Sequence, residues 1–226
     1  MRIIKIKEIV AFRRKSDRSR ISFVNNLKKE RKPESDISGG GDYWISCLSA
    51  IGNVFKYGDK IFLDNKIDLL SKKIRHTKIL RIKNQFQRNI NILTIFGDFD
   101  FQKIKPEVEL TFLRKPNDIS ILDINGLQIQ VKPDLVFSYT INNDREIGAV
   151  WFIAQIEGFD KFELGMFTDA LYRYLLNNHS KDFIINPHYC VAVDVYKGQS
   201  ISYEEIKNKN IHSLLDETVK EVKKVL

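Results

Sequence analysis

The spacing of hydrophobic positions changes along the chain and predicts a helical first part followed by a strand-rich second part. Up to about residue 105, apolar side chains recur every three or four positions, which is typical of amphipathic helices. This spacing predicts helices over residues 17–32, 42–57, 62–74 and 79–96. Residues 2–12 mix basic and apolar residues without a clear period, and we interpret them as a strand. Residues 33–41, PESDISGGG, predict a flexible linker.

After residue 105 the pattern favours strands, with helices between and after them. Alternating or continuous apolar runs predict strands over residues 108–113, 119–124, 127–131, 134–141, 147–154 and 188–196. Asn125-Gly126 tolerates positive φ at both positions and predicts a two-residue hairpin turn. Residues 147–154 are rich in β-branched and aromatic side chains, which is typical of a strand buried on both faces. Helices are predicted over residues 160–177 and 203–226.

Together these elements predict an α/β (α+β) protein in two parts. Residues 1–105 would form a basic, mainly helical N-terminal region. Residues 106–226 would form a mixed β-sheet flanked by helices, with all the predicted strands of this part in one central sheet.

Oxygen-bearing side chains stand where two of the predicted strands begin and end. Asp134 opens one strand, and Gln155 and Glu157 lie at the exit of the next, where a spacing of two would put both on one face. Oxygen ligands are those that Mg²⁺ prefers. The pattern therefore predicts a divalent-metal site formed by Asp134, Gln155 and Glu157.

Residues 108–197 resemble the PD-(D/E)XK nuclease superfamily, which includes many restriction enzymes. The resemblance rests on Pro133-Asp134 followed by Gln155-Ile156-Glu157 and on the order of the elements. It implies a restriction-endonuclease-like fold and a DNA nuclease that depends on Mg²⁺ or Mn²⁺, in restriction or defence. Asp134, Gln155 and Glu157 would then be catalytic metal ligands.

The sequence departs from the superfamily motif at two positions. Gln155 stands where a second acidic ligand is expected, and Glu157 stands where a lysine is expected. Lys132 or Lys161 would have to supply the missing positive charge, and we include Lys161 among the catalytic candidates.

The formal net charge of +8 and the pI of about 9.3 favour an anionic partner, with nucleic acid, and DNA in particular, first. The densest basic cluster near the N-terminus is predicted to contact phosphates and consists of Arg13, Arg14, Lys15, Arg18 and Arg20. A solvated helix face explains the same cluster equally well. Two alternatives to the nuclease stay open: a catalytically inactive nuclease-fold module that binds nucleic acid or a partner protein, and an unrelated α+β interaction protein.

Other features of the sequence bear on location and partners. No apolar run approaches the roughly 20 residues of a membrane helix, so no membrane partner is expected. Cys47 and Cys190 stand alone and far apart in the sequence, and two unpaired thiols fit a reducing compartment. The N-terminus lacks the apolar core of a signal peptide. We therefore expect a cytoplasmic protein, with a homodimer as one compatible assembly.

Overall fold

The computed structural model of the chain describes residues 2–29, 43–114 and 120–226. Within these residues the α-helices are α1 (Ile6–Arg13), α2 (Asp17–Leu27), α3 (Ile45–Tyr57), α4 (Ile61–His76), α5 (Leu80–Gly97), α6 (Lys161–His179), α7 (Tyr203–Lys207) and α8 (Leu215–Val225). A 3₁₀ helix, η1, covers Phe101–Ile104. The strands are β1 (Ile4–Lys5), β2 (Thr111–Phe112), β3 (Ile121–Ile124), β4 (Leu127–Gln130), β5 (Leu135–Ile141), β6 (Asp144–Ile153), β7 (Ile184–Asp194) and β8 (Gln199–Ser202).

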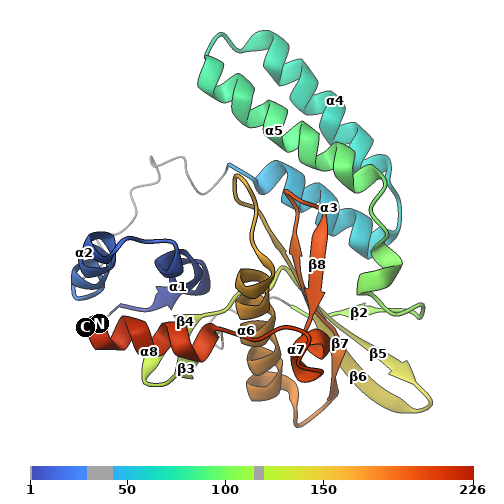
Figure 1. Cartoon of the computed structure of the whole chain (residues 1–226). Coiled ribbons are helices and arrows are strands. Elements are labelled where there is room, and N and C mark those ends of the chain that lie inside the picture. Colours follow the sequence, from blue (N-terminus) through green and yellow to red (C-terminus); the bar gives the residue numbers. More distant parts are fainter. Residues whose placement is uncertain (1, 30–42, 115–119) are drawn as a thin grey trace.

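The centre of the molecule is a five-stranded mixed sheet in the order β2-β5-β6-β7-β8 (Figure 1). β5 and β6 form an antiparallel hairpin in which Leu135 lies opposite Val150. β6 and β7 are parallel, and the chain makes the required crossover through α6. The pairing of β6 with β7 shifts register at Gly148, where an added Cβ would lie 2.7 Å from the Tyr189 carbonyl oxygen. Glycine is therefore needed for this close approach of two backbones.

Both faces of the sheet are covered, which gives a three-layer arrangement of helices, sheet and helices. One face presents Ala149 and Trp151 to a core shared with α1, α2, α6 and α8. The other face presents Val150 and Phe152 to a core shared with α3, α4 and α5. The alternation of these residues confirms that β6 is a strand buried on both faces, as its continuous apolar sequence predicts.

A smaller three-stranded sheet, in the order β1-β4-β3, lies beside the larger one. Its β3–β4 hairpin turns at Asn125 (φ 51°) and Gly126 (φ 81°), which confirms the predicted two-residue turn. The prediction that this hairpin belongs to the central sheet is wrong, because β4 pairs in parallel with β1 instead. A two-residue strand at the N-terminus thus decides where the hairpin is placed.

Three further predictions need correction. Residues 6–13 form helix α1 rather than a strand, since Ile6, Ile9 and Val10 follow helical spacing into the core. The predicted helix over 203–226 is split into α7 and α8, and the intervening Lys209 takes a left-handed φ of 60°. β8 was not predicted, and the strand over 108–113 is reduced to β2. The predicted linker over 33–41 lies outside the described residues.

The helical predictions for α3 to α6 are confirmed within three residues at each end. α2 begins at Asp17 as predicted but ends at Leu27, and residues 30–32 of that prediction lie outside the described residues. α3 ends at Tyr57 and is capped by Gly58, which has a left-handed φ of 74° and donates its backbone N–H to the Val54 carbonyl oxygen. Residues on either side of position 105 meet in both cores, because α1 and α2 pack with α6 and α8, and α3 packs on the sheet. The two parts of the sequence therefore fold around shared cores.

Candidate functional site

Asp134 lies at the end of the central sheet where β5 begins and several chain segments meet. We refer to this end of the strands as the edge that bears Asp134. Asp134 directly precedes β5, and because β5 and β6 are antiparallel, the start of β5 lies beside the end of β6. β7 is parallel to β6, so Asp194 at the end of β7 belongs to the same edge. The fold therefore brings Asp134 and the segment after β6 to one end of the sheet, as the sequence predicts.

The Asp134 carboxylate is fixed to the neighbouring strand. Its Oδ2 accepts a hydrogen bond of 2.8 Å from the backbone N–H of Phe152 in β6. The side chain is half-buried, and the preceding Pro133 is buried. Asp134 is thus held against the last residues of β6 with part of its surface open to solvent.

Gln155 and Glu157 lie beyond the end of β6, in a turn. The Gly158 backbone N–H donates to the Gln155 carbonyl oxygen at 3.0 Å, and Glu157 has a left-handed φ of 70°. The alternation of a strand, which would put the two side chains on one face, does not extend to these residues. Phe152 precedes Gln155 by three residues, and an extended chain advances about 3.3 Å per residue. The turn would have to fold back toward Asp134 for all three side chains to reach one ion.

The donor chemistry of this edge suits a hard cation, although its acidic groups are few. Within the described ranges of the chain, no group of three His, Cys, Asp or Glu side chains is placed to hold a metal ion. Mg²⁺ in nucleotide-processing sites is commonly bound by one or two carboxylates together with waters, so Asp134 and Glu157 offer the appropriate oxygens. The metal site remains a prediction that binding measurements have to test.

Lys7 in α1 is a cation near Asp134 that the sequence analysis missed. Partial desolvation lowers the pKa of the Lys7 ammonium, the negative charge of Asp134 works in the opposite direction, and Lys5 lowers this pKa further. Lys7 is nevertheless exposed by its solvent-accessible surface. No local pattern links Lys7 to Asp134, because they are far apart in sequence and meet only in the folded chain.

Lys161, the cation proposed from sequence, is the first residue of α6 and is exposed. Its Nζ lies 5.1 Å from the centroid of the neighbouring Phe162 ring. A cation–π contact of this kind is weak at an exposed site. Lys7 is therefore the better candidate for a positive charge beside Asp134.

The predicted phosphate-binding cluster is largely engaged in contacts within the protein. Arg13 donates to the Thr218 hydroxyl at 3.0 Å, and Arg20 lies 3.8 Å from the Glu221 carboxylate. Lys15 lies over the Phe23 ring, whereas Arg18 is exposed. These contacts join α1 and α2 to α8, so structural roles account for much of this cluster.

Arg14 ties α1 to the start of α6 and to the turn after β6. Its guanidinium donates to both carboxylate oxygens of the buried Glu163 and, at 2.9 Å, to the Gly158 carbonyl oxygen. Glu163 also completes a capping box with Asp160. The pKa of Arg14 is raised, chiefly by its hydrogen bonds to Glu163. Arg14 therefore helps to hold the turn that carries Glu157.

Asp194 fixes the same turn from the other side. This fully buried carboxylate accepts hydrogen bonds from the backbone N–H groups of Phe159 at 2.7 Å and Tyr196 at 2.9 Å. The Lys197 ammonium donates to the Phe159 carbonyl oxygen at 2.9 Å. The segment after β6 is thus held by polar contacts on both sides, next to the edge that bears Asp134.

Replacing Arg14 by alanine is expected to lower the free energy of unfolding by about 2–3 kcal/mol, because Glu163 would remain buried without its guanidinium partner. The expected loss of stability is smaller than for a fully buried ion pair, because the Arg14 side chain is 38% exposed. Urea unfolding measures the change. The matched control, Arg18→Ala in exposed α2, should change stability by less than about 0.5 kcal/mol. Equal losses in the two variants would contradict the structural role of Arg14.

Comparison with known proteins gives no family for the chain. No protein-family model matches it, and a search of curated proteins finds no match. Among the described residues, no helix is both long and apolar enough to cross a membrane. The structure by itself establishes a mixed α/β protein with two mixed sheets.

Proposed function

We propose that this protein is a Mg²⁺- or Mn²⁺-dependent DNA nuclease with a PD-(D/E)XK-like active site at the edge that bears Asp134. The observation that carries the proposal is the position of Asp134 at the start of β5, beside the end of β6, with the Gln155–Glu157 turn at the same edge. The parallel strand β7, reached through α6, follows in the order that the resemblance implies.

In this proposal Asp134 is the principal metal ligand, and Glu157 and the side-chain amide oxygen of Gln155 complete the protein's share of the site. A divalent ion held by these residues would supply polarisation of a phosphoryl oxygen and a lower pKa for bound water. The Phe152 backbone N–H orients the Asp134 carboxylate through the 2.8 Å hydrogen bond. The Lys7 ammonium, which interacts electrostatically with Asp134, would be the positive charge that stabilises the scissile phosphate.

A second candidate function is a catalytically inactive module that keeps the fold and binds nucleic acid. A specific observation favours it: in the part of the chain that the structure describes, no three acidic, His or Cys side chains are arranged around one point. The neutral Gln155 at the position of an acidic ligand agrees with this alternative.

Cleavage of supercoiled plasmid DNA by the purified protein tests the proposal. We expect nicked or linear product with Mg²⁺ or Mn²⁺ and none with EDTA, because hydrolysis needs the ion. Binding of the DNA without cleavage, in the presence of either metal ion, would refute the nuclease and support the inactive module. Cleavage that persists in EDTA would refute metal dependence.

A further inference from the structure

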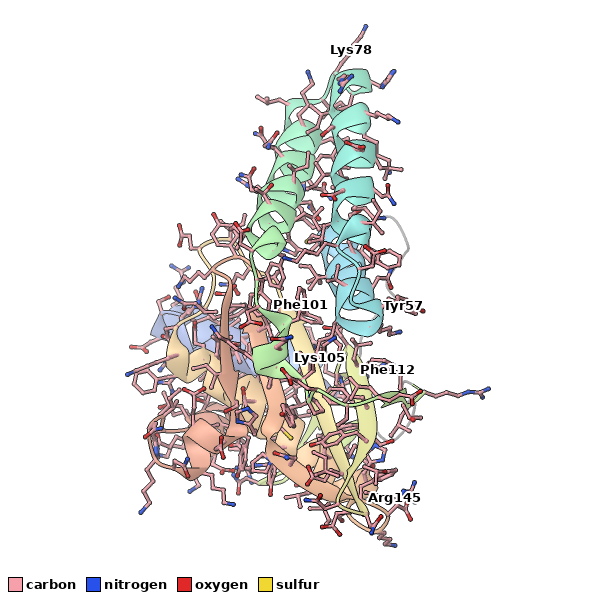
Figure 2. All side chains as sticks on the ribbon, turned by 90° about the vertical axis from the view of Figure 1, so that its right-hand side faces the viewer. Tyr57, Lys78, Phe101, Lys105, Phe112 and Arg145 are labelled. Carbon is pink, nitrogen blue, oxygen red and sulfur yellow. The ribbon has the colours of Figure 1, made fainter. Side chains whose placement is uncertain are left out.

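Helices α4 and α5 form an antiparallel hairpin that projects away from the sheet (Figure 1). Figure 2 shows Lys78 at its far end, while Tyr57, Phe101 and Phe112 lie near the sheet. We call residues 71–88 the outer hairpin. No residue of this segment is buried, although α4 and α5 pack against each other and Ile74, Ile82 and Phe86 are half-buried. The outer hairpin thus presents most of its surface to solvent.

The outer hairpin concentrates positive charge. The chain has no Asp or Glu between Asp68 and Asp98. Over the same stretch it has seven Lys and Arg residues, all in the outer hairpin, namely Lys72, Lys73, Arg75, Lys78, Arg81, Lys83 and Arg88. For comparison, the formal net charge of the whole chain is +8. The basicity of the protein is therefore concentrated on one projecting element.

These cations differ from several arginines of the protein body in lacking acidic partners. Arg2, Arg14 and Arg173 each form an ion pair with a carboxylate. Among the described residues, none of the seven outer-hairpin cations forms an ion pair. Lys72, Lys73, Arg75, Lys78 and Arg81 are exposed. Neighbouring like charges on a helix are destabilising, and an external polyanion would relieve that repulsion.

The distribution of side chains favours nucleic acid over an anionic membrane as the partner. The cations extend over the last turn of α4, the connection at Lys78 and the first two turns of α5, where they alternate with neutral amides, including Asn84, Gln85 and Gln87. A helix that lies in a membrane surface needs a broad apolar face. The only large apolar side chains exposed on the described outer hairpin are Ile79 and Leu80. An arrangement of loosely placed cations and amides is suited to a phosphate backbone.

We propose that the outer hairpin is a sequence-independent binding site for the phosphate backbone of duplex DNA. α4 has 16 residues, so at a rise of 1.5 Å per residue the hairpin is about 24 Å long and holds this contact away from the sheet. The site goes beyond the proposed hydrolysis, because it requires neither a metal ion nor Asp134. It also replaces the Arg13–Arg20 cluster as the main DNA contact.

Binding of a fluorescein-labelled DNA duplex, measured by fluorescence anisotropy in EDTA over a series of NaCl concentrations, tests this site. The test variant carries Lys72→Gln, Arg75→Gln, Lys78→Gln and Arg81→Gln. The matched control carries Lys181→Gln, Lys207→Gln, Lys220→Gln and Lys224→Gln, which removes the same charge from exposed positions elsewhere. Circular dichroism confirms that both variants are folded.

We expect the hairpin variant to bind at least about 10-fold more weakly, with a log K against log [salt] slope reduced by about 3–4, because each phosphate contact contributes about 0.9. The control variant should bind DNA with an affinity within about twofold of wild type, because its four substituted lysines lie outside the proposed contact with DNA. Equal loss in both variants, or tighter wild-type binding to phosphatidylserine vesicles than to DNA, would overturn the proposal. Binding through the hairpin without plasmid cleavage would refute the nuclease and leave this site intact.

Discussion

Replacing Asp134 by asparagine is expected to reduce metal-dependent cleavage of DNA by about 100-fold or more. Loss of the principal metal ligand removes several kcal/mol of transition-state stabilisation, and each 1.36 kcal/mol corresponds to about tenfold in rate. Asparagine retains a side-chain oxygen that accepts the hydrogen bond from the Phe152 backbone N–H, so the end of the sheet should remain intact. The initial rate of plasmid nicking in Mg²⁺ measures the effect.

The matched control for this variant is Asp144→Asn. Asp144 is exposed and lies at the opposite end of the same β5–β6 hairpin. The Asp144→Asn substitution should leave the nicking rate within about twofold of wild type, as is usual for an exposed position away from a site. DNA binding in EDTA should survive in Asp134→Asn, since the outer hairpin is unchanged. Cleavage by Asp134→Asn at nearly the wild-type rate would remove Asp134 from the site.

Replacing Phe55 by alanine is expected to lower the free energy of unfolding by about 3–5 kcal/mol. Phe55 in α3 is fully buried, and its ring centroid lies 5.4 Å from that of Phe137 and 6.1 Å from that of Phe152. The substitution leaves a cavity between α3 and the sheet, at the base of the projecting hairpin. The loss is a large part of a typical stability of about 5–15 kcal/mol. Equilibrium unfolding in urea measures it.

Phe162→Ala is the control, because the Phe162 side chain at the start of α6 is 38% exposed. It removes the same atoms from a position that leaves no comparable cavity, so its effect should be at most about 1 kcal/mol. A Phe55→Ala loss no greater than that of Phe162→Ala would show that α3 does not pack on the sheet as described.

Local sequence patterns predicted the elements whose conformation is decided by near neighbours. The positive φ angles of Asn125 and Gly126 follow from the backbone freedom of these residues. The burial of β6 follows from its continuous apolar run, and the end of α3 follows from Gly58. The common edge of Asp134 and the Gln155–Glu157 segment was also predictable, because two consecutive antiparallel strands must bring those ends together.

Patterns failed where contacts distant in sequence decide the outcome. Ile4 pairs with Ile129, and this contact separates the β3–β4 hairpin from the central sheet. The strand predicted at residues 6–13 is a helix, because a short basic and apolar segment carries no unambiguous period. The split between α7 and α8 depends on Lys209, whose left-handed backbone no composition rule would indicate.

The sequence by itself determined the element types, the concentration of positive charge around residues 72–88 and the presence of Asp134 at a strand start. Only the tertiary structure decided which cations are held by acidic partners and which are not. It joined Arg14 to Glu163, brought Lys7 near Asp134 and, among the described residues, placed no carboxylate from elsewhere in an ion pair with the outer hairpin. The physical reason is that helix and strand periods are set by neighbours in the chain, whereas ion pairing depends on which surfaces the fold brings together.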